Sequence, residues 1–135
     1  MSDTLVDTNV LIDVANEDPR WLAWSSRRLA EAADAGVLVI NQIVYSELAA
    51  GYASREQLDT AITPQRFRRE GIPWDAAFMA GLAFLRYRRA GGRRPSPLPD
   101  FYIGAHALVA GLPVITRDAA RYRTYFPEVE LVAPD

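Results

Sequence analysis

Hydrophobic positions fall into two patterns along the chain. The first is a short continuous apolar run, which is typical of a strand buried on both faces of a parallel sheet. Such runs lie at residues 4–6, 37–40, 113–115 and 129–132. Between them, apolar residues recur at spacings of three and four, which predicts helices with one buried face. The alternation of the two patterns predicts an α/β fold with a parallel sheet.

Capping and breaking residues set the expected helix boundaries. Helices are predicted from Thr8 or Asn9 through Ile12 and beyond, from near Pro19 to Gly36, from Asn41 or Gln42 to near Gly51, from Ser54 to Ile62, from Trp74 to about Ala90, from Pro99 to Gly111, and to about Tyr125. Residues 91–97 are rich in glycine, arginine and proline and are expected to form a loop. The arginines between Arg66 and Arg69 are expected on a solvated face. The sequence has no internal repeat and no low-complexity segment, so residues 1–135 are expected to form a single domain.

Two residue types are absent from the chain, and their absence limits the catalytic chemistry available to it. The chain has no cysteine, and all fifteen basic residues are arginine. Cysteine nucleophiles, disulfides and cysteine-bound zinc are thereby excluded, as are P-loop, Schiff-base and general-base lysines. The net charge of −2 does not by itself indicate a nucleic-acid binder. No apolar run approaches ~20 residues and no signal peptide is evident, so we expect a cytoplasmic protein with no membrane segment.

Four acidic residues stand where a parallel sheet would bring them together. Asp7 and Asp118 each follow a predicted strand, Glu47 lies about two turns into a helix, and Asp100 lies in a first helical turn. Ligands of α/β sheets bind at the carboxyl ends of strands, and Mg²⁺ prefers carboxylate oxygens. Helix capping or surface exposure remains an alternative for Glu47, Asp100 and Asp118. Asp7 is harder to explain in that way, because it ends an apolar strand with a charge.

Read together, the segments around these acids resemble the PIN-domain family, and in particular VapC-type toxins of type II toxin–antitoxin modules. The matching segments are Leu5–Ile12, Tyr45–Leu48, Asp100–Ala107, Val114–Asp118 and Tyr122–Pro127. They follow the family's order and cover nearly the whole chain. The resemblance implies a three-layer, Rossmann-like α/β/α sandwich around a parallel sheet of about five strands.

The same resemblance implies an endoribonuclease that depends on Mg²⁺, with Mn²⁺ as a substitute. It implies a homodimer that a cognate VapB-like antitoxin neutralises by occupying the active-site groove. The family's catalytic acids correspond to Asp7, Glu47, Asp100 and Asp118. Asp7, Asp100 and Asp118 are the expected metal ligands, and Glu47 is expected to orient or deprotonate the attacking water. Asn9 and Thr116 correspond to polar positions that support these acids.

Several other residues have two interpretations each. The arginines at 86, 88, 89, 93, 94 and 117 are candidate RNA contacts, although a helix end and a solvated loop also favour basic residues. For His106, the lone histidine, we expect a structural role rather than a catalytic one. Some of Trp21, Trp24, Trp74 and Phe78 are expected in the core or in an interface with a second copy or the antitoxin.

Two other functions remain open. The first is a different metal-dependent enzyme on the same fold class, such as a phosphatase or a DNA nuclease. An aspartyl-phosphate phosphatase would need a second Asp two residues after the first, where this chain has Asn9. The second is a non-catalytic PIN-like RNA-binding module, against which the complete set of four acids argues. The sequence does not indicate which RNA is cut.

Overall fold

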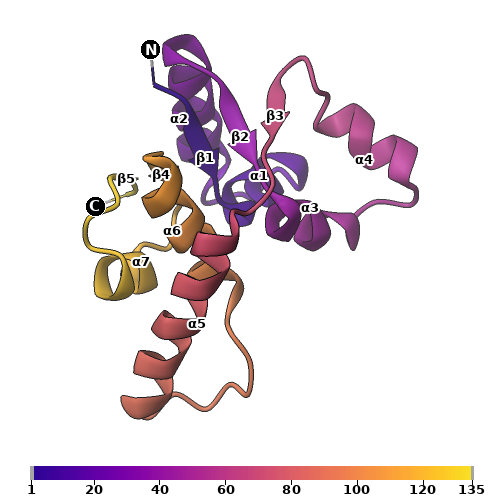
Figure 1. Cartoon of the computed structure of the whole chain (residues 1–135). Helices are drawn as coiled ribbons and strands as arrows, with labels where there is room; N and C mark the ends of the chain where they lie inside the picture. The colour runs from indigo at the N-terminus through magenta and orange to yellow at the C-terminus, as the bar shows by residue number, and fades with distance from the viewer. Residues whose placement is uncertain (1, 135) are drawn as a thin grey trace.

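A computed structural model describes residues 2–134, and within them five strands form one parallel sheet (Figure 1). The strands are β1 (Thr4–Val6), β2 (Leu38–Ile40), β3 (Phe67–Arg69), β4 (Val114–Ile115) and β5 (Leu131–Val132). Their order in the sheet is β3-β2-β1-β4-β5, and each neighbouring pair is parallel. The predicted α/β fold with about five parallel strands is therefore confirmed.

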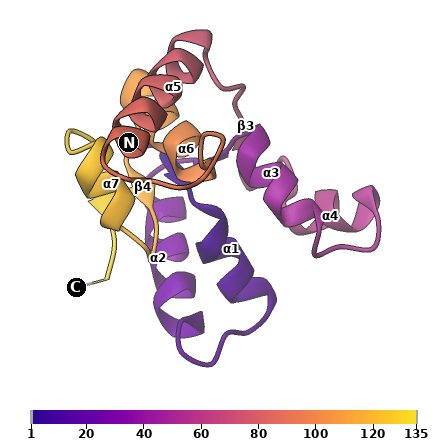
Figure 2. The ribbon, with the colours of Figure 1, turned by 90° about the horizontal axis from the view of Figure 1, so that it is seen from below.

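The described chain has seven helices. They are α1 (Thr8–Ala15), α2 (Leu22–Ala35), α3 (Gln42–Ala49), α4 (Arg55–Ala61), α5 (Trp74–Arg89), α6 (Pro99–Ala110) and α7 (Ala120–Tyr125). Helix α4 projects away from the sheet beside α3 (Figure 1). Figure 2 shows α1 and α2 on one side of the sheet and α5 and α6 on the other, so the fold has three layers. No helix within residues 2–134 is both long and apolar enough to span a membrane.

The core lies on both faces of the three central strands. Leu5 and Val6 of β1, Val39 of β2, and Val114 and Ile115 of β4 are all fully buried. Burial on both faces explains why these strands have continuous apolar sequences rather than alternating ones. The core therefore holds the carboxyl ends of β1 and β4 in fixed positions beside each other.

Strand β3 was not predicted. The segment from Arg66 to Arg69, which we expected to form a solvated face, contains this edge strand. Phe67 is buried, whereas the Arg68 and Arg69 side chains are each 40% exposed. The Arg68 guanidinium donates to the carboxylates of Asp3 and Glu70, both at 2.7 Å. An edge strand accommodates such charged side chains, and they protect it from pairing with other chains. A three-residue strand with two arginines lacks the apolar signal on which the prediction relied.

Helix boundaries agree with the prediction at two caps and differ at two others. Asn41 caps α3 by accepting from the Val44 amide at 3.1 Å, and Ser54 caps α4 in the same way. The first helix is preceded by Asp7 as its N-cap, not by Thr8 or Asn9, and α2 begins at Leu22 rather than near Pro19.

The sheet reverses its winding direction between β1 and β4. From β1 the chain adds β2 and β3 on one side, then crosses to add β4 and β5 on the other. The Asp7 amide donates to the Ile115 carbonyl at 2.9 Å, which ties the two strand ends together. Open α/β sheets bind ligands at such a switch point, outside the carboxyl ends of the strands.

Candidate active site

Asp7 lies at the switch point, immediately after β1, and only 5% of it is exposed. It occupies the N-cap position of α1, yet its side chain makes no capping hydrogen bond. A helix-capping role therefore does not explain this buried acid. Burial raises the pKa of Asp7, and the charge of Glu47 raises it further, while hydrogen bonds from Tyr122 and Thr116 oppose the rise.

Three side chains donate to one oxygen of the Asp7 carboxylate. The Tyr122 hydroxyl lies 2.8 Å from Oδ2, and the Thr116 hydroxyl lies 2.9 Å from the same atom. The Asn9 amide is within 3.5 Å of Oδ2 and 3.3 Å of the Thr116 hydroxyl. Asn9 and Thr116 thus lie where the sequence prediction placed them, beside Asp7. Hydrogen bonds to the ionised form offset part of the free-energy cost of burying this charge.

Asp100 approaches Asp7 from the first turn of α6. Burial and the charge of Asp7 together raise the pKa of Asp100 to about 6. The charge of Asp118 raises this pKa as well, whereas Arg121, whose Nη1 lies 3.5 Å from Asp100 Oδ2, lowers it. The charges of Asp7 and Asp118 both act on Asp100, so the three predicted aspartates lie in one region, without forming a close cluster within residues 2–134.

Glu47 and Asp118 complete the acidic region from its solvent side. Both residues are exposed. The Thr8 hydroxyl donates to Glu47 Oε1 at 2.7 Å, which holds the glutamate on α3 against the start of α1. The Asp118 amide donates to the Thr116 hydroxyl at 3.1 Å, and no side-chain cap precedes α7 in the described chain. Asp118 is therefore fixed through its backbone while its carboxylate faces solvent.

The chemistry of these residues fits a weakly held, hard divalent cation. Within residues 2–134, no three His, Cys, Asp or Glu side chains converge closely enough to form a metal cage. Mg²⁺ does not need one, because it is usually bound by one or two carboxylates, several waters and the phosphates of its substrate. Burial raises the pKa of both Asp7 and Asp100, the charges of neighbouring acids raise them further, and a bound cation would oppose both effects.

The candidate RNA-binding arginines divide into two groups. Arg117 is engaged by the buried Asp13, with its Nε 2.9 and 3.0 Å from the two carboxylate oxygens, and Ser25 also donates to that carboxylate. Arg86 donates to the Tyr125 carbonyl at 3.1 Å and therefore ties α5 to α7.

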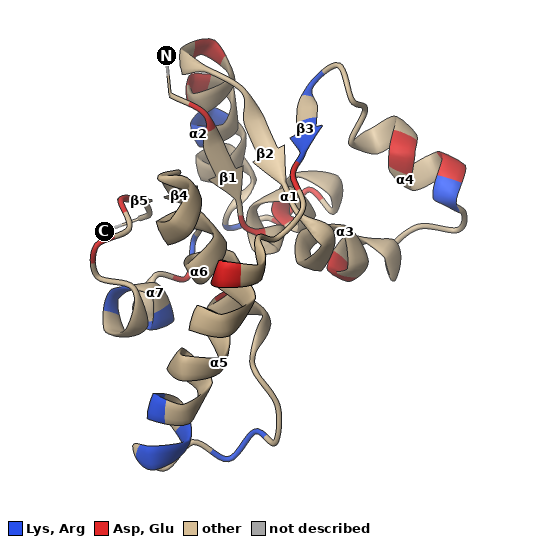
Figure 3. Ribbon diagram, viewed as in Figure 1, with Lys and Arg blue, Asp and Glu red and all other residues tan. Residues whose placement is uncertain are grey.

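The second group comprises Arg89, Arg93 and Arg94, which are exposed. Figure 3 shows basic residues at the end of α5 and along the loop that follows, away from the sheet. Arg88 closes this loop by donating to the Arg93 and Arg94 carbonyls. Contact between these arginines and RNA remains a prediction.

His106 is a buried residue of the α6 core, as expected. Asn41 uses its side-chain oxygen to cap α3, so its amide nitrogen is the donor to His106 Nδ1, 3.1 Å away. The other ring nitrogen is 3.7 Å from Glu70. Burial lowers the pKa of His106, while the charge of Glu70 opposes that effect. A neutral histidine held between these partners has a structural role.

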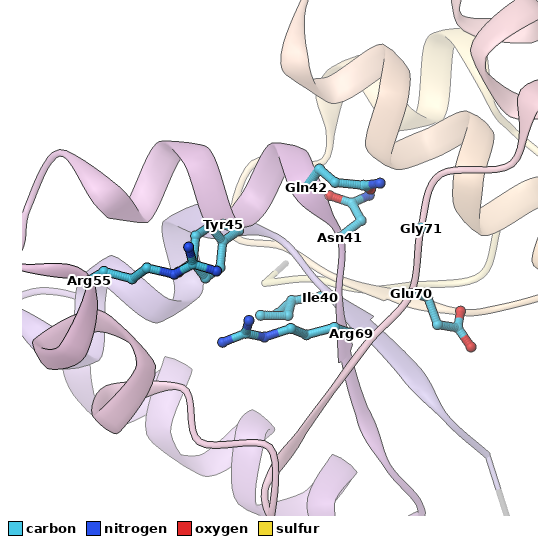
Figure 4. Close-up of a pocket in the computed structure, with 8 residues that line it drawn as sticks. All are labelled: Ile40, Asn41, Gln42, Tyr45, Arg55, Arg69, Glu70 and Gly71. Atoms are coloured by element: carbon cyan, nitrogen blue, oxygen red, sulfur yellow. The ribbon is translucent and has the colours of Figure 1, made fainter.

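A separate cleft of about 310 Å³ opens at the carboxyl ends of β2 and β3 (Figure 4). Its lining residues are Ile40, Asn41, Gln42, Tyr45, Arg55, Arg69, Glu70 and Gly71. None of the four acids lines it. Tyr45 faces α4, where its hydroxyl donates to Asp59 at 2.8 Å, whereas Glu47 faces α1. Helix α3 therefore separates this cleft from the acidic region, and concavity alone does not mark the site of chemistry.

Helix α5 carries an exposed apolar stripe. The exposed fractions are 91% for Trp74, 69% for Phe78, 47% for Leu82 and 45% for Leu85. These residues recur at spacings of four and three and so lie on one face of the helix. Trp74 and Phe78 are therefore not core residues, whereas Trp24 is partly buried against the core. An apolar patch of this kind usually marks an interaction surface.

Two residues of the acidic region were not predicted as site residues, namely Arg121 and Tyr122. Both come from α7, which brings Arg121 to Asp100 and Tyr122 to Asp7. Their adjacency to the predicted Asp118 was the available signal, because a short helix after that residue must pass close to the same strand end.

The PIN domain family model matches residues 4–127, which is nearly the whole chain. The chain therefore belongs to the PIN domain family, and the family inferred from the sequence motifs is confirmed. No curated protein matches the sequence.

Solved structures share this fold along their entire length. VapBC2 from Rickettsia felis, bound to a DNA fragment from their promoter, has a chain 20% identical to this one with a TM-score of 0.73, covering 98% of this chain and 99% of the other. For VapBC-1 from nontypeable Haemophilus influenzae the identity is 22%, the TM-score 0.71 and the coverage 97% of both chains. For a toxin–antitoxin complex from Klebsiella pneumoniae these values are 27%, 0.64 and 98% of both. The similarity supports the VapC-type resemblance within the family.

Proposed function

We propose that this protein is the toxin of a type II toxin–antitoxin system and acts as a metal-dependent endoribonuclease in the cytoplasm. One observation carries the proposal most directly. Asp7, at the switch point, and Asp100, 93 positions later in sequence, lie close enough for the charge of Asp7 to raise the pKa of Asp100. The buried carboxylate of Asp7, with the partly buried carboxylate of Asp100 beside it and no cation, is unfavourable for folding, so selection for stability alone does not explain the arrangement.

Asp7, Asp100 and Asp118 are the proposed ligands of Mg²⁺, with Mn²⁺ as a substitute. When bound, such an ion neutralises charge on the scissile phosphate and lowers the pKa of the attacking water. Glu47 lies at the solvent side of the region and is proposed to orient or deprotonate that water, directly or through the metal. Arg121 is positioned beside Asp100 to contact a phosphate oxygen as negative charge develops.

The test compares the purified wild-type protein with Asp7→Asn on mixed RNA, with Mg²⁺ and with EDTA. Asp34→Asn, at an exposed position of α2, is the matched control. We expect cleavage by the wild type and the control only with Mg²⁺, and no cleavage by Asp7→Asn despite cooperative unfolding. RNA binding without cleavage by the wild type would instead support the non-catalytic module. Cleavage by Asp7→Asn at the wild-type rate would refute the assignment of Asp7.

Mapping RNA 5′ ends after induced expression, with Asp7→Asn as the negative control, would then identify the substrate.

The α5 stripe is the proposed interface with a second copy of the chain. Its four exposed members are uncharged, so two copies can meet there without like-charge repulsion. Phe78→Glu is expected to convert a dimer into a monomer, as measured by light scattering, whereas the control Asp34→Asn stays dimeric. A monomeric wild type would refute this interface.

A groove of about 540 Å³ shares Leu82 and Leu85 with the stripe and is a proposed site for an antitoxin segment, apart from the active-site groove that the resemblance implies. Its other lining residues include the apolar Met79, Leu108 and Phe126 and the basic Arg86 and Arg89. An amphipathic segment with acidic residues would match both features. Co-expression with the gene neighbour tests the partner: we expect co-purification and rescue of growth, and Arg86→Glu with Arg89→Glu should weaken both. If growth is rescued equally well with that double variant, the antitoxin binds at another surface.

A further inference from the structure

Tyr122 is a fully buried residue on α7 that reaches the acidic region. Its backbone carbonyl accepts from the Phe126 amide at 2.8 Å, and Phe126 is itself buried in the core. Because the Tyr122 side chain is fully buried in the packed core, its ring has little freedom to move. Its hydroxyl lies 2.8 Å from Asp7 Oδ2.

The Thr116 hydroxyl donates to the same oxygen from the residue that follows β4, at 2.9 Å. Two donors from separate segments fix both the position of Oδ2 and the rotation of the carboxylate. Among residues 2–134, no side chain donates a hydrogen bond to Asp7 Oδ1. The network is therefore asymmetric, with one oxygen engaged by the protein and the other free of side-chain donors.

We propose that Tyr122 is a positioning residue of the acidic site, which together with Thr116 holds Asp7 Oδ2 and leaves Oδ1 to bind a divalent cation. This inference rests on the proposed metal-dependent function. Side chains that hydrogen-bond to a metal ligand fix the orientation of that ligand before the cation binds. Their loss typically weakens metal affinity by about 10–100-fold.

A purely structural role for the hydroxyl would give a different result. A buried tyrosine needs a hydrogen-bond partner, and Asp7 would serve as one whether or not it binds a cation. Removal of the hydroxyl would then lower the melting temperature and leave the cation affinity unchanged. Cation affinity therefore distinguishes positioning from core packing.

The experiment measures Mn²⁺ binding by electron paramagnetic resonance, together with thermal unfolding and RNA cleavage, for the wild type, Tyr122→Phe and Tyr125→Phe. Tyr125 lies three residues further along α7, and none of the hydrogen bonds in the described chain joins its hydroxyl to an acid. We expect Tyr122→Phe to bind Mn²⁺ about 10–100-fold more weakly. Its kcat should fall while its KM for RNA stays near the wild-type value. Tyr125→Phe should match the wild type in Mn²⁺ affinity.

Wild-type Mn²⁺ affinity in Tyr122→Phe would overturn the positioning role and leave the proposed function intact. A wild-type protein that neither binds Mn²⁺ nor cleaves RNA would overturn both. If Tyr122→Phe does not fold, Thr116→Val and Thr116→Ser decide between the outcomes. The proposal predicts weaker Mn²⁺ binding for the valine and retained binding for the serine, and equal binding by both variants would overturn it.

Discussion

Asp100 gives the sharpest quantitative prediction, because ionisation of its carboxyl group is unfavourable in the folded protein when no cation is bound. We expect Asp100→Asn to make the metal-free protein more stable at neutral pH. The pKa of Asp100 is about 6 in the folded protein against an ordinary value of 3.8. Two pH units at ~1.4 kcal/mol each correspond to about 3 kcal/mol of destabilisation when the group is ionised. The side chain is 25% exposed, and asparagine loses the ionic attraction of Arg121, so we expect a gain of about 1–2 kcal/mol.

The raised pKa of Asp100 also determines how the free energy of unfolding changes with pH. The folded protein holds the Asp100 proton more tightly than the unfolded chain does, so stability decreases as pH rises from about 4 to about 6. Below that window both states are protonated, and the advantage of Asp100→Asn should vanish. Above it, the advantage should be complete and constant.

Urea unfolding at pH 7.5 and pH 4, in EDTA, measures both quantities. Asp34→Asn serves as the control and should show no pH-dependent gain. Addition of Mg²⁺ at pH 7.5 should stabilise the wild type more than Asp100→Asn, because a cation that binds only the folded state adds stability by mass action. An Asp100→Asn variant that is less stable than the wild type at pH 7.5 in EDTA would refute the assigned repulsion. An equal gain at both pH values would refute its electrostatic origin.

Three other predictions concern the surrounding fold. A Cβ on Gly104 would lie 2.3 Å from the Phe126 ring, so Gly104→Ala should reduce the free energy of unfolding by about 1–3 kcal/mol, and Phe126→Leu should recover part of the loss. Arg117→Ala leaves the buried Asp13 carboxylate without its cation and should destabilise by about 2–3 kcal/mol; Asp13→Asn in the same chain should recover stability in thermal melts. The pKa of His106 is lowered, so its contribution to stability is lost as pH falls through about 6.5, and His106→Gln should flatten that decline in urea midpoints.

The sequence predicted most of the sheet because burial on both faces produces continuous apolar strands. Strand β3 escaped prediction for the opposite reason, since an edge strand has a solvent-facing side that tolerates Arg68 and Arg69. Its pairing with β2 is a long-range property that three residues do not encode alone.

The acids were predictable individually, but their interactions were not. Asp7 was recognisable as a charge that ends an apolar strand. The hydrogen bond from Tyr122 and the approach of Arg121 depend on how α7 packs after β4, which neither spacing nor periodicity specifies. The exposure of Trp74 was equally hidden, because an aromatic residue on a helix face is compatible with both core and interface.

The late position of β4 in the chain has a consequence for synthesis. The nascent chain contains Asp7 and Glu47 long before it contains Thr116 and Tyr122, whose hydroxyls hold Asp7. Strand β4 also pairs with β1, so the strand end beside Asp7 is missing until residues 114–115 have been synthesised. A fragment of this chain that ends before β4 lacks both hydroxyls that hold Asp7. The topology thus delays completion of the acidic site until nearly all of the domain has been translated.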